Sequence, residues 1–129
     1  NLKTKILVVV SGEGGSGGAL ALGVGDHVAI LEYGTYSVAS PEACASIVWR
    51  ESDKAPEAAE AMKVGANDLK KIGIVDEIIV EPIGGAHQDY DTISASIKSS
   101  LLTNLAELSK FSQEELLQRR YQRLLKIGA

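Results

Sequence analysis

Glycine is concentrated in one short stretch of this chain, and that stretch limits the possible folds more than any other feature. Seven of the thirteen glycines fall within residues 12–25. They follow Ile6–Val10, an unbroken and mostly β-branched run that is typical of a strand covered on both faces. The sequence therefore predicts a strand that runs into a glycine-rich turn, followed by a short helix of small side chains over Ser16–Leu22.

Size, composition and charge narrow the class of protein. A length of 129 residues fits one domain, and 45% hydrophobic with 23% charged residues is the balance of an ordinary α/β chain. A net charge of -4 does not favour a nucleic-acid partner, because binding phosphates requires clustered cations. No apolar run is long enough to cross a bilayer, so we expect no membrane span. One cysteine and two histidines are too few for a structural zinc site, so we expect no metal on this chain.

Periodicity and capping residues predict the other elements. Ser40-Pro41-Glu42 and Ser112-x-x-Glu115 are helix starts, the second of them a capping box. Further strands are expected over residues 28–31, 36–38 and 74–80, and helices over 41–50, 57–62, 67–72, 91–109 and 112–127.

The two long C-terminal helices have different expected partners. The helix over 91–109 carries an apolar stripe, which we expect to pack, like Trp49, against other subunits or a preceding part of the chain, with core packing within these residues as the alternative. The stripe consists of Ile93, Ile97, Leu101, Leu105 and Leu108. The helix over 112–127 is expected to turn Leu116, Leu117, Leu124 and Leu125 inward.

The basic residues of the last helix are expected to face solvent, and the cysteine is expected to be buried. A solvated helix end that complements the helix dipole is favoured over an anion site for the basic residues. These are Arg119, Arg120, Arg123 and Lys126. Cys44 shares a helical face with Ile47 and Val48, which predicts a buried, inert thiol.

Two known motifs match the glycine-rich segment only in part. Gly12-x-Gly14-x-x-Gly17 with Glu32 fits a dinucleotide fingerprint, but the residues that follow are too few for the parallel crossover of that fold. Gly14-x-Ser16-x-Gly18 fits a nucleophile elbow with Asp76 and His87 downstream, but Ser16 stands six residues after the predicted strand.

A third possible function, an oxyanion hole, requires only backbone N–H groups and no particular side chains. Adjacent glycines at a helix start present unobstructed backbone N–H groups, which can stabilise an oxyanion with help from the helix dipole. The alternative to all three functions is that the glycines serve tight turns and close packing.

Motifs spread over the whole chain resemble those of the carboxyltransferase α subunit of multi-subunit acetyl-CoA carboxylase. They are Gly12-Glu13-Gly14-Gly15-Ser16-Gly17-Gly18-Ala19-Leu20, Gly25-Asp26, Tyr36-Ser37-Val38, Ser40-Pro41-Glu42, 54–60, 76–79, Glu81-Pro82 and Gly84-Gly85-Ala86-His87. Ala43 departs from the glycine that the family often has there. The resemblance implies an α/β, crotonase-like (ClpP/crotonase) superhelix of strand-strand-helix units, incomplete at the N-terminus. Residues 1–129 would form the C-terminal part of that single domain, ending in the helices 91–109 and 112–127.

The resemblance also implies an activity and its partners. The family transfers the carboxyl group of carboxybiotin, borne by a separate carrier protein, to acetyl-CoA and yields malonyl-CoA for fatty-acid synthesis. Two α and two β subunits form the carboxyltransferase, which works with the biotin carboxyl carrier protein and biotin carboxylase. Zinc is expected on the β subunit, and the location is the bacterial cytoplasm or the plastid stroma.

Carried onto this sequence, the resemblance gives each residue of the glycine-rich segment a role. The N–H groups of Gly17 and Gly18 would face the ureido oxygen of biotin, while Gly14 and Gly15 shape the loop on the substrate side. Tyr33 and Tyr36 either line the biotin pocket or only pack. His87 either holds a partner or ligand or bonds to nearby backbone. Alternative functions are carboxylation of another short acyl-CoA, serine hydrolysis through Ser16, and nucleotide binding.

Overall fold

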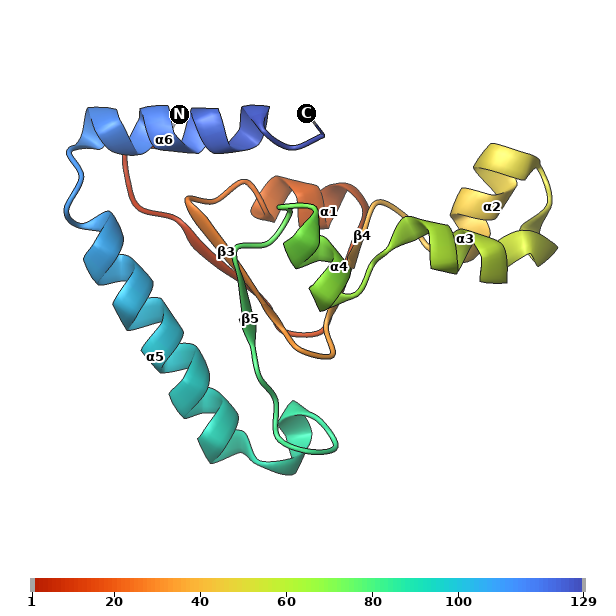
Figure 1. Cartoon of the computed structure of the whole chain (residues 1–129), viewed down its shortest axis with the longest axis horizontal. Coiled ribbons are helices and arrows are strands. Elements are labelled where there is room, and N and C mark those ends of the chain that lie inside the picture. Colours follow the sequence, from red (N-terminus) through yellow and green to blue (C-terminus); the bar gives the residue numbers. More distant parts are fainter. Residues whose placement is uncertain (1, 129) are drawn as a thin grey trace.

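The computed structural model describes residues 2–128 as a mixed α/β fold (Figure 1). Its strands are β1 (Leu7–Val10), β2 (Glu13–Gly15), β3 (His27–Leu31), β4 (Thr35–Ser37) and β5 (Glu77–Ile79). Its α-helices are α1 (Ser16–Leu22), α2 (Pro41–Trp49), α3 (Ala55–Met62), α4 (Ala66–Lys71), α5 (Tyr90–Leu108) and α6 (Gln113–Leu125). Short 3-10 helices occupy Ser52–Lys54 (η1) and Ala86–Gln88 (η2).

The strands form two small parallel sheets. β3 lies between β1 and β5, with Leu7 opposite His27 and Ala29 opposite Glu77. β2 pairs with β4 in the second sheet, with Glu13 opposite Thr35. The order β1-β2-α1 and then β3-β4-α2 is therefore a strand-strand-helix unit used twice, with the first strand of each unit in one sheet and the second strand in the other.

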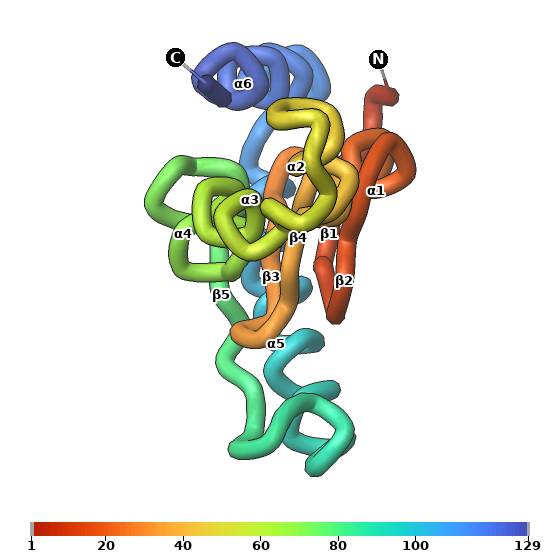
Figure 2. The backbone as a smooth tube through the Cα atoms, turned by 90° about the vertical axis from the view of Figure 1, so that its right-hand side faces the viewer, coloured from red at the N-terminus to blue at the C-terminus, as the bar shows by residue number. Residues whose placement is uncertain are grey.

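The core lies on both faces of β3, because successive side chains of a strand point to opposite faces. Val28 and Ile30 pack with Leu69 of α4 on one face. Ala29 and Leu31 pack with Ile93 of α5 on the other. Figure 1 shows the same layering, with α4 and α5 on opposite sides of β5, and in Figure 2 α5 passes behind the strands. β3 is thus the strand covered on both faces, whereas β1 is half-buried over most of its length.

α2 and α3 form a helical pair that projects from the sheets (Figure 1). Each buries one alanine, Ala45 and Ala58. The predicted buried face of α2 is wrong, since Ile47 and Val48 are 76% and 65% exposed and Cys44 is half-buried. The physical reason is that α2 packs mainly against the short segments η1 and α3, which cover only a narrow strip of its surface.

The fifth strand is shorter than the sequence predicts. Ile74 and Val75 donate their N–H groups to the Leu69 carbonyl oxygen, at 2.9 and 3.4 Å. These two residues therefore close the C-terminal end of α4, and regular strand pairing begins only at Glu77.

The C-terminal helices follow their predicted boundaries closely. The stripe on α5 packs partly within this chain, since Ile93 and Leu108 are buried, but Leu105 is exposed. α6 begins with the predicted capping box between Ser112 and Glu115. Leu116 is buried as predicted, whereas the inward placement of Leu125 is wrong because this side chain is 55% exposed. None of the helices among residues 2–128 is long and apolar enough to span a membrane.

Candidate active site at the start of a short helix

The glycine-rich segment contains a strand that the sequence analysis missed. β2 (Glu13–Gly15) runs directly into α1, and the Thr35 N–H donates to the Gly12 carbonyl oxygen at 2.9 Å. Two of its three residues are glycines, which have low strand propensity, so the segment carries no strand signal of its own. Its partner Thr35–Ser37 does carry one, but pairing between segments twenty residues apart cannot be found from local pattern.

The chain passes from β2 into α1 with no residue between them. Gly15 is extended, with φ -137° and ψ 153°, and Ser16 has a φ of 59°. A non-glycine residue in the left-handed region costs about 1–2 kcal/mol, so the surroundings must hold it there. The amides of Gly17 and Gly18 follow in the first turn of α1, where N–H groups have no acceptor within the helix.

Gly17 and Gly18 are exposed, and the described chain gives no internal reason for them to be glycine. A Cβ added at either position would meet no atom within 4 Å, and neither residue has a positive φ. Gly14 is different, because a Cβ there would stand 2.8 Å from Cδ2 of Tyr36. Close packing therefore explains Gly14 but not the pair Gly17–Gly18.

Tyr36 lies beside this turn. Its hydroxyl donates to the Ala19 carbonyl oxygen at 2.8 Å. Burial raises the pKa of the Tyr36 phenol, with a smaller opposing effect from Arg123, so the hydroxyl stays protonated and acts as a donor. The observed contacts of Tyr36 are packing and helix contacts, and its contact with a substrate stays a prediction, as do the site roles of Gly14, Gly15, Gly17 and Gly18.

The nucleophile-elbow alternative has its serine directly after a strand, but in the described part of the chain no histidine and aspartate are bonded to that serine in a triad. β2 ends at Gly15, so the expected separation of Ser16 from its strand is wrong. Asp76, however, pairs with Arg123 at 2.9 Å, and the exposed His87 ring bonds to the Gln88 side chain at 3.0 Å, not to backbone. Among residues 2–128 no hydrogen bond joins Ser16 to a histidine, so the described chain contains no assembled triad.

The dinucleotide alternative is not supported by the arrangement of this segment. β2 interrupts the glycine pattern between Gly12 and Gly17, which would have to form a continuous turn into the helix. The carboxylate of Glu32 instead accepts the N–H of Glu81 at 3.2 Å.

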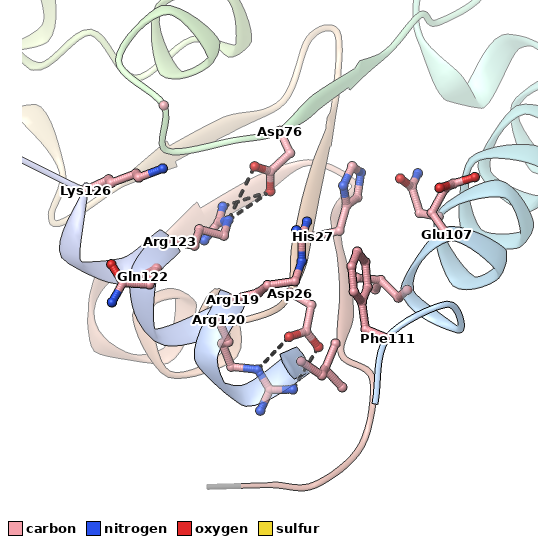
Figure 3. A pocket seen from close by; sticks show the side chains of 14 residues that line it. Asp26, His27, Asp76, Glu107, Phe111, Arg119, Arg120, Gln122, Arg123 and Lys126 are labelled. Carbon is pink, nitrogen blue, oxygen red and sulfur yellow. Dashed lines mark hydrogen bonds and ion pairs between the residues drawn. The ribbon is translucent and has the colours of Figure 1, made fainter. Parts of the chain in front are cut away.

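A separate pocket of about 600 Å³ lies between α6, the C-terminal end of α5 and the residues at the starts of β3 and β5 (Figure 3). The expectation of a fully solvated basic helix is wrong here. Arg120 is 9% exposed and binds both carboxylate oxygens of Asp26 at 2.8 Å, and Arg123 pairs with Asp76. The two carboxylates stand just before β3 and β5, and their ion pairs with Arg120 and Arg123 neutralise both guanidinium charges internally, which does not favour an anion site.

Metal ligands do not gather in the part of the chain that the structure describes. Among residues 2–128 no group of three or more His, Cys, Asp or Glu side chains is placed to hold a metal ion.

The family model and the similar proteins that match this chain point to the same family. The family model described as acetyl co-enzyme A carboxylase carboxyltransferase-like matches residues 1–128. Relatives from Photobacterium profundum, Vibrio vulnificus and Photorhabdus laumondii are 59%, 58% and 58% identical over 127 residues, and each is named acetyl-coenzyme A carboxylase carboxyl transferase subunit alpha. The match covers 98% of this chain and 40% of each relative, so the chain spans less than half the length of these relatives. The chain therefore belongs to the acetyl-CoA carboxylase carboxyltransferase-like family.

Proposed function

We propose that this chain is the C-terminal part of the α subunit of an acetyl-CoA carboxylase carboxyltransferase. The whole subunit would take part in moving the carboxyl group of carboxybiotin to acetyl-CoA, giving malonyl-CoA for fatty-acid synthesis. The observation that carries this proposal is the family match over 98% of the chain at 59% identity. The site adds support, because two adjacent glycines stand in the first turn of a helix, and a Cβ added at either would meet no atom within 4 Å.

The proposal includes the crotonase-like superhelix. Two successive strand-strand-helix units whose strands alternate between two parallel sheets support this architecture. The part of the relatives that precedes the matched 40% would supply the earlier units.

Gly17 and Gly18 would bind the biotin ring through their backbone N–H groups. Biotin, borne by a separate carrier protein, supplies the carboxyl group to be transferred. The open space over both glycines fits the close approach of a planar ring, which any side chain here would hinder. The N–H groups of Gly17 and Gly18 would donate to the ureido oxygen of this ring and would stabilise negative charge there more in the transition state than in the ground state.

Partners follow from the same proposal. We expect a β subunit that binds the acyl-CoA and holds zinc, the biotin carboxyl carrier protein, and biotin carboxylase. Because the relatives reported above are bacterial, the expected location is the bacterial cytoplasm.

The test uses the full-length α subunit co-purified with its β subunit, assayed for acetyl-CoA release from malonyl-CoA and free biotin. Gly17→Val and Gly18→Val should each lower the rate by about 10²-fold or more, because a side chain blocks access to the donors. Valine is no worse a helix former than glycine, so the thermal melt should be unchanged.

The matched control is Gly65→Val, at the start of α4, where a Cβ also meets nothing within 4 Å. It should keep the wild-type rate. Full activity in both Gly17→Val and Gly18→Val would refute the roles of these amides, and a wild-type complex without carboxyl transfer would refute the function itself.

A further inference from the structure

One side chain contacts the chain on both sides of the turn Gly15–Gly18. Before the turn, the Tyr36 ring lies against Gly14, where it leaves no room for a Cβ. After the turn, the Tyr36 hydroxyl donates to the Ala19 carbonyl oxygen at 2.8 Å. Tyr36 thus spans the segment from β4, a strand seventeen residues further along the chain than Ala19.

The turn needs such an anchor. Ser16 holds an unfavourable φ of 59°, and the two residues after it are glycines, the most flexible residue type. α1 has only seven residues and buries none of them, so neither its length nor its packing stabilises it.

Little else in the described chain fixes α1. Among residues 2–128, the bond from Tyr36 is the only side-chain hydrogen bond to this helix. The Ala19 carbonyl oxygen that accepts it also accepts the N–H of Gly23, which closes the end of the helix. Losing the phenol would therefore leave the orientation of the first turn to the strained backbone alone.

We propose that Tyr36 is a positioning residue for carboxyl transfer, which holds the first turn of α1 so that the Gly17 and Gly18 amides point together at the developing oxyanion. This inference rests on the proposed function. The hydroxyl acts through the helix and not on the substrate, since its proton is already donated to Ala19. A donor that moves by a few tenths of an ångström weakens transition-state stabilisation while substrate binding is little changed.

The experiment compares Tyr36→Phe with wild type in the full-length α subunit assembled with its β subunit. The kcat of the malonyl-CoA and free-biotin reaction should fall by about 10-fold, with the KM for biotin within about 2-fold. The ring remains, so the packing on Gly14 should persist and the complex should stay assembled. Tyr90→Phe, which removes the hydroxyl of a 71% exposed tyrosine, should keep wild-type kcat and KM.

Two kinetic results would overturn the proposal. A raised KM for biotin with an unchanged kcat would mean that Tyr36 contacts the substrate, and unchanged values of both would mean that it serves packing alone.

Amide hydrogen exchange tests the anchoring separately from catalysis. In Tyr36→Phe, the amides of residues 19–23 should exchange about 10-fold faster than in wild type, because the helix opens more often. Unchanged exchange there would also overturn the proposal. Absence of carboxyl transfer in the wild-type complex would instead count against the proposed function, and the exchange result would still decide whether Tyr36 anchors α1.

Discussion

At the scale of single residues, Ser16 separates the proposed carboxyltransferase from a serine hydrolase. Ser16 directly follows strand β2, but among residues 2–128 no histidine is hydrogen-bonded to it. Ser16→Ala should keep the carboxyltransferase rate of the full-length complex within about 3-fold, whereas removing a true nucleophile costs about 10⁶-fold. Ser11→Ala is the matched control, and a fluorophosphonate probe should label neither protein. Labelling that Ser16→Ala abolishes would instead establish the hydrolase.

Glu77 gives a second prediction at this scale, through its carboxylate. One oxygen accepts hydrogen bonds from His27, Ser100 and Asn104 at 2.9, 2.8 and 2.9 Å. Burial acts to raise the pKa of Glu77, but these hydrogen bonds outweigh it and the net pKa is lowered. A lowered folded-state pKa contributes stability above the unfolded-state pKa, and this stability is lost as the pH falls through the folded-state value.

Glu77→Gln should therefore lower the melting temperature of the full-length subunit at neutral pH, with a loss of about 1–2 kcal/mol. The difference from wild type should stay constant from about pH 7 to about pH 5 and shrink as the pH falls to about 3, since the wild-type carboxylate becomes protonated only as the pH passes below the ordinary glutamate pKa and through the lowered folded-state value. Glu107→Gln, which removes an exposed pair with Lys110, should change little at either pH. A melting-temperature difference between Glu77→Gln and wild type that stays constant over this whole pH range would contradict a stabilising role of the Glu77 charge.

At the scale of elements, the buried side chain of Arg120 is a main contact through which α6 docks. Arg120 binds Asp26 through two nitrogens and also donates to the carbonyl oxygens of Leu2 and Thr4, at 2.8 and 2.7 Å. Asp26 in turn accepts the N–H of Ile6 at 2.7 Å. This cluster ties the last helix to the segment before β1 and to the start of β3.

Arg120→Ala should cost about 3–5 kcal/mol, because it leaves the buried Asp26 carboxylate unpaired. Hydrogen-exchange mass spectrometry of the full-length subunit should show faster exchange over α6 and residues 2–6. Arg119→Ala removes an exposed cation that lies over the Phe111 ring at 4.1 Å, and its cost should stay below about 1 kcal/mol. Equal effects of the two substitutions would show that the buried pair is not what holds α6.

At the scale of the whole molecule, the described surface carries many large apolar side chains. Leu22, Val38 and Ile47 are 75%, 76% and 76% exposed, and Ile83 is 97% exposed. Extensive exposed apolar surface marks contacts with other protein surfaces. The chain also spans only 40% of its relatives, so partners within the same subunit and beyond it are expected to cover this surface.

The 129-residue chain expressed alone should therefore self-associate and bind a hydrophobic dye. Size-exclusion chromatography with light scattering should show oligomers, and dye fluorescence per mole should exceed that of the full-length subunit in complex. A monodisperse monomer that binds no dye would mean that these side chains are tolerated in water.

Local rules were sufficient for much of this fold. The apolar run of β3, the caps at Ser40 and Ser112, and the boundaries of α5 and α6 follow from neighbours within a few residues. The family is likewise carried by motifs that can be read in order along the chain. In these places the sequence alone determined the element or the family, because each signal depends on residues within a few positions of one another.

Only the tertiary structure decided the remaining features. β2 is a strand because β4 pairs with it. Arg120 is buried because Asp26, 94 residues away in sequence, supplies its counter-charge. Tyr36 donates a hydrogen bond to Ala19 of α1, seventeen residues earlier in the chain. Each of these outcomes depends on which distant segment supplies a hydrogen-bond acceptor, a counter-charge or a packing surface. No local pattern carries that information, because the free energy of such contacts arises only when the chain has brought the two segments together.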